Sequence, residues 1–249
     1  SPFNLVNISG EHTGDVIDTN STSNYDTDID VETLTVTAVR LGSSEGSGTA
    51  GTVGSALTGT YGQLTLNANG SYTYVANQTA ADALDAGDVV TDSFNYTVSD
   101  GAATDIAVIT ITVIGINDTP TAQNDVGVIV EDGTLTVANS ANATLTGTYD
   151  ATGENSGDLI DTSSSSHTDS DSDASDSLTI TQIKKSGGSN SAVGIGSSYN
   201  SSGTQVTGTY GTLTIGADGS YTYAATQDAA DVLDVGETAT DVFVYTLSD

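Results

Sequence analysis

Aspartates at every second position of the stretch YDTDID suggest metal chemistry, and the same spacing recurs in the second half of the chain. The two sets are Asp26, Asp28 and Asp30, and Asp169, Asp171 and Asp173. Carboxylates spaced in this way in a tight loop are able to converge on one hard cation. Ca²⁺ takes about six to eight oxygen ligands and tolerates irregular geometry, whereas Mg²⁺ fits less well. The spacing predicts calcium sites, with a solvated aspartate-rich turn as the alternative.

An EF-hand does not explain this pattern. The sixth position of an EF-hand loop requires Gly and the twelfth requires Glu. Here the sixth position is Val31 or Ala174, and the twelfth is Thr37 or Ile180.

Catalytic chemistry is disfavoured by the residues that are present. The two histidines, His12 and His167, do not align between the halves, and the chain contains no cysteine. No nucleophile elbow, phosphate loop or zinc spacing occurs. The sequence therefore predicts a protein that is not an enzyme.

The aspartates lie within a long internal repeat, so the fold of each copy determines their positions. GTYGQLTLNANGSYTY at residues 59–74 recurs as GTYGTLTIGADGSYTY at 208–223, and GEHTGDVIDT at 10–19 recurs as GENSGDLIDT at 153–162. Solenoid repeats have periods of about 20 to 50 residues, and this repeat is far longer. Each copy is therefore expected to be a domain with its own core.

The alignment predicts two incomplete domains. Residue 1 aligns with residue 144, and Asp249 aligns with Asp100. The predicted domains are residues 1–117, lacking the first strand, and residues 118–249, lacking the last strand. Because an incomplete sheet exposes backbone donors, two interpretations stay open: a window from a longer array, or a subunit completed by strand exchange.

Within each copy the hydrophobic period is two, which indicates strands. Leu64, Leu66, Tyr72 and Tyr74 alternate with polar residues around Asn69-Gly70, a strong hairpin signal. A short helical turn is expected in TAADALDAG and in QDAADVLDVG. The predicted fold is all-β, as tandem Ig-like antiparallel β-sandwiches. Expected strands cover residues 33–40, 62–67, 71–76, 91–99, 104–114, 126–137, 177–184, 211–215, 220–225 and 239–247.

The aromatic residues of these strands recur between the copies and are expected to be core rather than a sugar-binding platform. They are Tyr61, Tyr72, Tyr74, Phe94 and Tyr96, with counterparts Tyr210, Tyr221, Tyr223, Phe243 and Tyr245.

The net charge of the chain limits the kinds of molecule that it is expected to bind. The chain has 33 acidic residues, three basic ones and a formal charge of −30. This charge repels nucleic acid and anionic membranes and attracts cations. No apolar run approaches the roughly 20 residues that span a bilayer, so membrane insertion is not expected. A secreted, cysteine-free chain needs another means of stabilisation, for which bound metal is a common choice.

Several motifs resemble the VCBS repeat, which occurs in tandem in very large secreted bacterial surface proteins. They are GTYGTLTIGADGSYTY, AADVLDVGETATDVFVYTLSD and YTVSDGAATDIAVITITVIGINDTPTAQND. The segment GINDTP is also similar to the terminal signature of cadherin domains, although Gly115 replaces its first aspartate. The resemblance implies an Ig-like or cadherin-like fold, with calcium at domain junctions bound by Asn117 and Asp118. Asp100 and Asp125 are candidates to supplement that site.

The predicted function is a calcium-stabilised stalk segment of a large extracellular adhesin of the RTX type, exported by type I secretion. Its expected partners are neighbouring repeats of the same or identical chains, with cell-surface glycans or other cells as adhesion targets. Two alternatives stay open: a subunit of an extracellular filament or surface layer, and a glycan-binding module.

Overall fold

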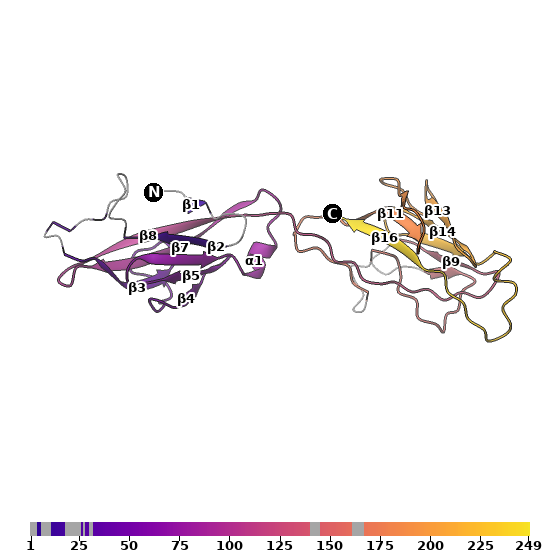
Figure 1. The fold of residues 1–249 in the computed structure, drawn as a ribbon, viewed down its shortest axis with the longest axis horizontal. Coiled ribbons are helices and arrows are strands. Elements are labelled where there is room, and N and C mark those ends of the chain that lie inside the picture. The colour runs from indigo at the N-terminus through magenta and orange to yellow at the C-terminus, as the bar shows by residue number, and fades with distance from the viewer. Residues whose placement is uncertain are drawn as a thin grey trace. The chain divides into compact units, whose positions relative to one another are not determined.

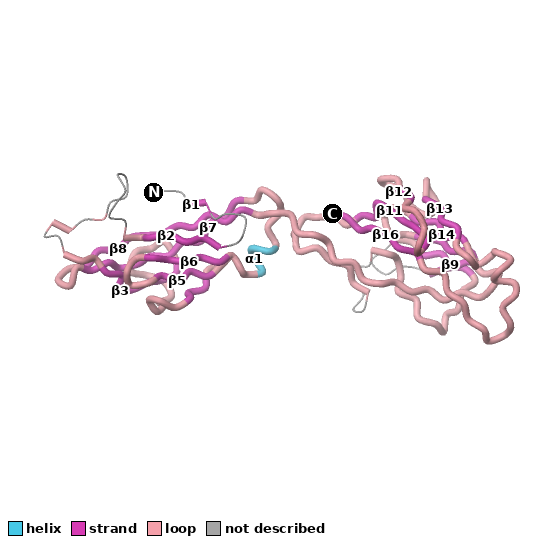
Figure 2. Tube along the Cα trace, in the orientation of Figure 1, coloured by secondary structure: helices cyan, strands magenta, loops and turns pink. Residues whose placement is uncertain are grey.

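The computed structural model describes residues 4–5, 11–17, 26, 28–29, 32–139, 145–160 and 167–249. They form two compact units. Unit 1 comprises Ser1–Asp118 and Ser172–Ser175, and unit 2 comprises Thr119–Asp171 and Asp176–Asp249. Figures 1 and 2 show that strands and loops dominate both units. Each unit has a separate hydrophobic core.

Unit 1 is a sandwich of two four-stranded sheets, with the strand orders β1-β8-β7-β3 and β2-β6-β5-β4. All neighbouring strands are antiparallel except β1 and β8, which are parallel. The strands are β1 (Asn4–Leu5), β2 (Glu11–Asp15), β3 (Thr35–Leu41), β4 (Ala56–Thr58), β5 (Gln63–Leu66), β6 (Ser71–Val75), β7 (Val89–Ser99) and β8 (Thr104–Ile114). A short helix, α1 (Thr79–Asp82), follows β6.

The alternation of residue types explains how unit 1 buries its core. Along β5 and β6, Leu64, Leu66, Tyr72 and Tyr74 are at most 3 % exposed, while the intervening residues face outward. Successive side chains of a strand point to opposite faces, so this alternation gives each sheet one apolar face. Tyr74 of one sheet packs edge-to-face on Phe94 of the other, with ring centroids 6.4 Å apart.

Unit 2 also has two sheets, with the strand orders β10-β9-β15-β14-β13 and β12-β11-β16. All of their pairings are antiparallel. The strands are β9 (Thr134–Val137), β10 (Leu145–Gly147), β11 (Thr179–Lys185), β12 (Ser191–Ala192), β13 (Thr204–Thr207), β14 (Thr212–Ile215), β15 (Tyr221–Ala224) and β16 (Phe243–Ser248).

Corresponding strand pairs of the two units have the same register, in addition to similar sequences. Leu41 is opposite Phe94 in the pair β3 and β7, and Lys185 is opposite Phe243 in the pair β11 and β16. Both pairs carry a register shift near the same point. The units differ in that β7 is flanked by β3 and β8, whereas β16 pairs with β11 alone among the described strands.

The predicted fold class, all-β with antiparallel sandwiches, is confirmed. The expected aromatic core is also confirmed for Tyr72, Tyr74, Phe94 and Tyr96, which are at most 7 % exposed. In unit 2, Tyr223, Phe243 and Tyr245 pack on the core but are only partly buried. Strand β8 supplies Ile109, Ile111 and Val113 to the core of unit 1, and none of the described strands takes the corresponding place beside β16.

Two predicted elements are wrong in extent. The strand expected over residues 126–137 is restricted to β9, because Asp132 adopts a positive φ of 57° and Gly133 N–H bonds to Val130 O. The second helical turn, in QDAADVLDVG, consists of separate turns instead of a helix. Val232 replaces the Ala83 of the first copy there, and β-branched residues lose side-chain freedom in a helix.

Candidate metal centres

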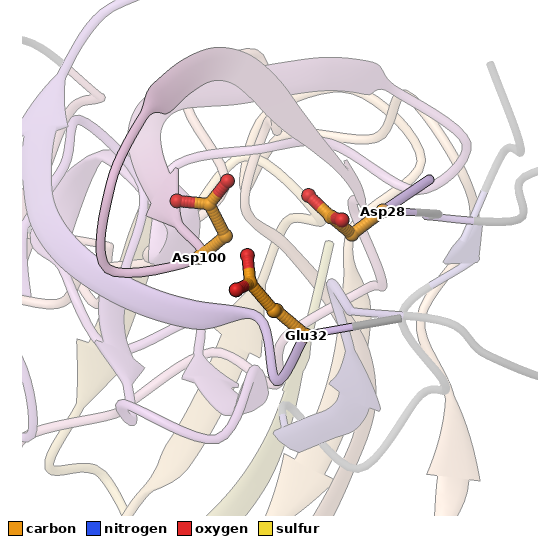
Figure 3. A group of neighbouring side chains, drawn as sticks. All are labelled: Asp28, Glu32 and Asp100. Carbon is orange, nitrogen blue, oxygen red and sulfur yellow. The ribbon is translucent and has the colours of Figure 1, made fainter. Parts of the chain in front are cut away.

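Three carboxylates from two distant segments of unit 1 converge on one place (Figure 3). Asp28 and Glu32 precede β3, and Asp100 lies in the turn between β7 and β8. One oxygen atom of each residue lies within 4.8 Å of the others. Asp28 and Asp100 are half-buried, and Glu32 is exposed.

The turn after β7 fixes the orientation of Asp100. Its Oδ1 accepts hydrogen bonds of 2.6 Å from the backbone N–H groups of both Ala102 and Ala103. Ser99 Oγ closes the same turn by donating to Ala103 O at 2.9 Å. The backbone donors hold the pKa of Asp100 below its usual value, so this carboxylate is charged at neutral pH.

A second group of carboxylates lies in the loop before β11. It comprises Asp171, Asp173 and Asp176. Asp171 is the repeat counterpart of Asp28. The two groups therefore arise from corresponding loops of the two copies.

Contacts within unit 1 hold part of this loop in place. Asp173 is 4 % exposed, and its Oδ2 accepts a hydrogen bond from Asp118 N–H at 2.7 Å. Ser175 donates to Asp85 from its N–H at 3.1 Å and also from its hydroxyl. The hydroxyl bond is the main reason that the pKa of Asp85 lies below its usual value.

Contacts within unit 2 hold the start of the loop. Asp169 is 2 % exposed, and its Oδ1 accepts a hydrogen bond from Gln123 N–H at 2.7 Å. Thr121 and Ser170 exchange two backbone hydrogen bonds of 2.8 and 3.1 Å. The buried Asp173 and Asp169 thus accept hydrogen bonds from Asp118, in the GINDTP segment, and from Gln123 shortly after it.

Among the described residues, the other predicted ligands are not members of either group. Asp26 is half-buried. Burial of Tyr96 is the main cause that raises the pKa of this tyrosine to about 12, and the negative charge of Asp26 raises it further. Asp30 falls outside the described residues. Asn117 is exposed, and its Nδ2 donates to Asp118 O at 2.7 Å.

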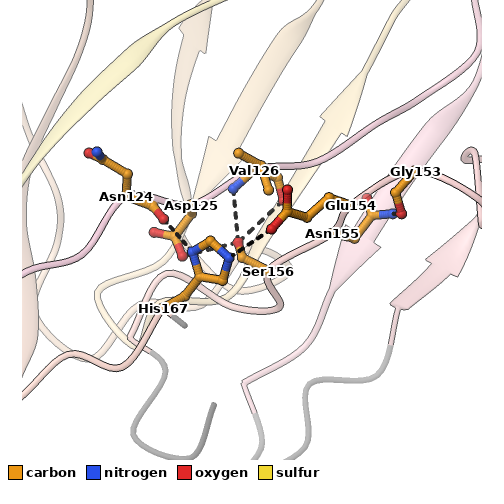
Figure 4. A network of polar contacts seen from close by, with 8 residues as sticks. All are labelled: Asn124, Asp125, Val126, Gly153, Glu154, Asn155, Ser156 and His167. Carbon is orange, nitrogen blue, oxygen red and sulfur yellow. Dashed lines mark hydrogen bonds and ion pairs between the residues drawn. The ribbon is translucent and has the colours of Figure 1, made fainter. Parts of the chain in front are cut away.

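Asp125 belongs to a different polar network in unit 2 (Figure 4). It accepts hydrogen bonds from the hydroxyls of Tyr245 at 2.8 Å and Ser156 at 3.1 Å. Burial raises its pKa to about 6 in spite of these two donors. Nearby, His167 Nδ1 lies 2.6 Å from Asn124 O, a bond that raises the pKa of the imidazole.

Each unit also contains a buried aspartate that anchors a loop. Asp92 is 3 % exposed and accepts hydrogen bonds from the N–H groups of Thr60, Tyr61 and Gly62 at 2.9 to 3.1 Å. The Tyr74 hydroxyl donates a fourth bond to it at 2.6 Å. Asp92 lies on β7, whereas these donors belong to the other sheet or its loop, so its carboxylate links the two sheets.

Asp241 repeats this arrangement in unit 2. It accepts from Thr209, Tyr210 and Gly211 N–H at 2.6 to 3.2 Å and from the Tyr223 hydroxyl at 2.7 Å. Burial acts to raise the pKa of Asp241, but the donors outweigh it and hold the pKa below its usual value. A basic side chain also lies near this anchor, with Lys185 Nζ 3.8 Å from Asp241 Oδ1.

Sequence reasoning missed Glu32, Asp176 and both loop anchors. Glu32 continues the alternate spacing of YDTDIDVE, so extending the motif by two residues would have found it. At the offset given by the strand registers, which equates Leu41 with Lys185, Asp176 aligns with Glu32, so the two missed acids occupy corresponding positions. Asp92 and Asp241 occupy the same position in the motif TD-x-F-x-Y, but one buried acid among 33 acidic residues has no distinct sequence signal.

The residues of the first group fit a hard cation. They offer carboxylate oxygens, the ligands that Ca²⁺ prefers. The chain has three Lys and Arg residues for 33 acidic ones, so most carboxylates have no basic side chain to pair with. Asp28, Glu32 and Asp100 would hold the ion.

Together, the sandwich fold and the acidic loops define an all-β structural module. Residues 6–115 match the family described as the bacterial cadherin-like domain, which supports a cadherin-like domain in this part of the chain. Such domains are adhesive or structural modules and are generally not enzymes. A search of curated proteins gave no match. Among the described residues, no helix has the length and apolar character required to cross a membrane.

Proposed function

We propose that this chain is a segment of an extracellular stalk in a large bacterial surface adhesin, built from tandem cadherin-like repeats of the VCBS type. Its role is structural and adhesive rather than catalytic. Neighbouring repeats of the same or identical chains are its direct partners, and the whole protein attaches to cell-surface glycans or other cells. The match over residues 6–115 supports the module type.

Calcium stabilisation is supported chiefly by the convergence of Asp28, Glu32 and Asp100. Residues 28–32 and residue 100 are far apart in sequence, and like charges repel, so their proximity in the folded state has an electrostatic cost. Bound Ca²⁺ supplies positive charge that offsets this repulsion. The corresponding loop of the second copy carries the group of Asp171, Asp173 and Asp176.

The proposed mechanism is thermodynamic linkage. A ligand that binds the folded state and not the unfolded one stabilises folding by about 2.7 kcal/mol at a hundredfold excess over its Kd. Folding brings Asp28 and Glu32 close to Asp100, so the complete group exists only in the folded chain.

Thermal unfolding of the chain with millimolar Ca²⁺ and then with EGTA tests this proposal. We expect a higher midpoint with Ca²⁺, and a smaller change with Mg²⁺ because of its stricter geometry. A midpoint that is identical in Ca²⁺ and EGTA would contradict the calcium assignment while leaving the adhesive role open.

A second candidate is a subunit of an extracellular filament or surface layer, assembled by strand exchange. An unpaired strand edge is a template for another chain. Electron microscopy of native material distinguishes the two candidates, because fibres built from this chain alone would contradict the single-chain stalk.

A further inference from the structure

The tip of the hairpin between β5 and β6 contains an exposed asparagine followed by a glycine, Asn69 and Gly70. Two backbone hydrogen bonds close the turn, from Asn67 N–H to Ser71 O at 2.9 Å and from Gly70 N–H to Asn67 O at 3.0 Å. Glycine has no Cβ, so its backbone nitrogen is easily approached and its peptide units rotate with little hindrance. The side-chain amide of Asn69 therefore lies next to a backbone nitrogen that can attack it.

Ser71 supplies both hydrogen bonds to the side-chain oxygen of Asn69. Asn69 Oδ1 accepts from Ser71 Oγ at 2.7 Å and from Ser71 N–H at 3.2 Å. Asn67 Nδ2 donates to Ser71 Oγ at 3.1 Å, so the proton of this hydroxyl is directed to Asn69. Donors at a carbonyl oxygen stabilise the negative charge that develops there when a nucleophile attacks the carbon. The amide of Asn69 is thus activated at its carbonyl group.

Unit 2 shows the same turn with a carboxylate in place of the amide. Asp218 is the counterpart of Asn69, and its Oδ1 accepts hydrogen bonds from Ser220 Oγ at 2.5 Å and Ser220 N–H at 3.1 Å. The corresponding backbone bonds close the turn, from Gly216 N–H to Ser220 O at 2.9 Å and from Gly219 N–H to Gly216 O at 3.3 Å. An aspartate at position 69 would thus keep both hydrogen bonds that the asparagine accepts.

A main chain lengthened at this point would not fit the turn. Gly70 is buried, and its carbonyl oxygen accepts a hydrogen bond from Val16 N–H at 2.9 Å. A Cβ on Gly70 would lie only 2.9 Å from Ile17 Cβ, so the packing on this side is tight. A β-linked aspartate inserts one more carbon atom into the main chain before Gly70 and displaces it from these contacts. The folded hairpin therefore favours an α-linked aspartate over a β-linked one.

We propose that Asn69 is a site of spontaneous covalent modification, at which Gly70 N attacks the side-chain amide and the asparagine becomes an α-linked aspartate. Ser71 is the positioning residue, because both of its donors bond to the oxygen on Asn69 Cγ. The conversion adds one negative charge to an exposed hairpin tip of unit 1. This inference is independent of calcium binding and of the adhesive role.

The reaction has two steps and consumes one water molecule. In the first step, a bond forms between Gly70 N and Asn69 Cγ, and the bond between Cγ and Nδ2 breaks. Gly70 N loses its proton to solvent, and the departing nitrogen takes up a proton and leaves as ammonia. In the second step, water adds to Cγ of the cyclic imide, the bond between Cγ and Gly70 N breaks, and this nitrogen regains a proton. The net change converts an amide and water into a carboxylic acid and ammonia.

A flip of the peptide unit between Asn69 and Gly70 starts the first step. Of the hydrogen bonds described above, the flip breaks the one from Gly70 N–H to Asn67 O, and it frees Gly70 N to turn toward Asn69 Cγ. The two bonds from Ser71 lie outside the flipped unit and still hold Asn69 Oδ1.

Ser71 also influences which product forms in the second step. Water that adds at Asn69 Cγ gives the α-linked aspartate, whereas water that adds at the backbone carbonyl of residue 69 gives the β-linked form. Because Ser71 donates to the oxygen on Cγ, it activates this carbon for the addition of water as well.

Peptide mapping of the full chain tests this proposal. The folded chain is kept at neutral pH for several weeks, digested, and analysed by mass spectrometry with fragmentation that separates α-linked from β-linked aspartate. Asn67 precedes Ala68 in the same hairpin and is the internal control. We expect severalfold faster conversion of Asn69 than of Asn67, with a larger share of α-linked product than the same chain gives in urea. Equal conversion of the two asparagines, or an equal share in both conditions, would overturn the proposal.

Variants of Ser71 test its positioning role. Ser71→Ala removes the hydroxyl donor, so it should slow the conversion about three- to tenfold in the folded chain and lower the share of α-linked product. Ser71→Thr keeps the hydroxyl and should retain the rate and product of the wild type. In urea the three proteins should react alike. A folded Ser71→Ala chain that reacts as fast as the wild type, with the same products, would refute the role of Ser71.

The fit of the product is tested by Asn69→Asp. Since unit 2 holds an aspartate in the same turn with the same donors, this variant should keep the urea midpoint of unit 1. A clearly lowered midpoint would contradict an α-linked product that the folded hairpin accommodates.

Discussion

The Tyr74 hydroxyl lies 2.6 Å from Asp92 Oδ2 in the interior of unit 1, and in unit 2 Tyr223 and Asp241 repeat this pair at 2.7 Å. Burial raises the pKa of both tyrosines well above the usual value, and the hydrogen bond to the aspartate raises it further. The phenols therefore stay protonated and act as donors to the carboxylates. Each pair completes the set of donors that holds the GTYG loop.

Replacing the first anchor should destabilise unit 1 strongly. Asp92→Ala leaves three backbone N–H groups and the Tyr74 hydroxyl without their acceptor, and each unsatisfied buried donor costs about 1 kcal/mol or more. We expect a loss of at least about 3 kcal/mol. Hydrogen exchange of unit 1 under increasing urea measures it, and the exposed Asp88→Ala serves as control. Equal effects of the two variants would show that the anchor is not structural.

Gly211, which bonds to the anchor Asp241 of unit 2, should not accept a side chain without a loss of stability. A Cβ at Gly211 would overlap the Tyr223 ring and Ala224 O, whereas a Cβ at Gly194 has no atom within 4 Å. Gly211→Ala should therefore lower the stability of unit 2 by about 1 to 3 kcal/mol. Gly194→Ala should stay within about 0.5 kcal/mol of the wild type. Urea midpoints of unit 2 compare the two variants, and a neutral Gly211→Ala would mean that the loop is able to move away.

Neutralising the carboxylates near β3 should weaken the calcium response of unit 1. Glu32→Gln and Asp100→Asn each remove a charge from the group shown in Figure 3. We expect each variant to lose at least about half of the calcium-dependent stabilisation, because calcium affinity depends on the ligand charge count. Calorimetric titration with Ca²⁺ gives the affinity directly. The exposed Glu45→Gln is the matched control, and an equal loss in this variant would indicate a general charge effect.

Unit 2 should gain stability from Asp125 when the pH is lowered. The folded-state pKa of Asp125 is about 6 and lies above that of an ordinary aspartate, so the folded state binds the proton more tightly. This contribution is complete below pH about 4 and is lost as the pH rises through about 6. At pH 7, Asp125→Asn should exceed the wild type by up to about 3 kcal/mol, and the difference should vanish near pH 4.

Urea unfolding of unit 2 in EGTA at several pH values measures this difference. The exposed Asp231→Asn controls for the general reduction of net charge. A difference between wild type and Asp125→Asn that does not vary with pH would refute the role of this carboxyl.

Much of the fold followed from local sequence rules. The period-two pattern of Leu64, Leu66, Tyr72 and Tyr74 predicted both the strands and the buried face, because alternation along a strand is a local property. The Asn69-Gly70 turn was equally clear, since Gly70 has a φ of 90° that few other residues tolerate.

The partner of a strand was not predictable in the same way. Nothing in Glu11–Asp15 marks it as the neighbour of β6, because strand pairing depends on competition among distant segments. The same limit applies to the candidate site. Spacing identified Asp28, but the approach of Asp100 depends on how the β7–β8 turn folds back beside that segment.

The position of Asp92 between the sheets has a mechanical consequence. A pull that slides one sheet of unit 1 over the other would load its four hydrogen bonds together, because all of them end on one carboxylate. Bonds loaded in parallel share the force and must break together, whereas bonds loaded in series open one by one. Each repeat thus contains its own set of bonds that resist shear between its two sheets. Adding more repeats to the chain therefore need not lower the mechanical resistance of any one repeat.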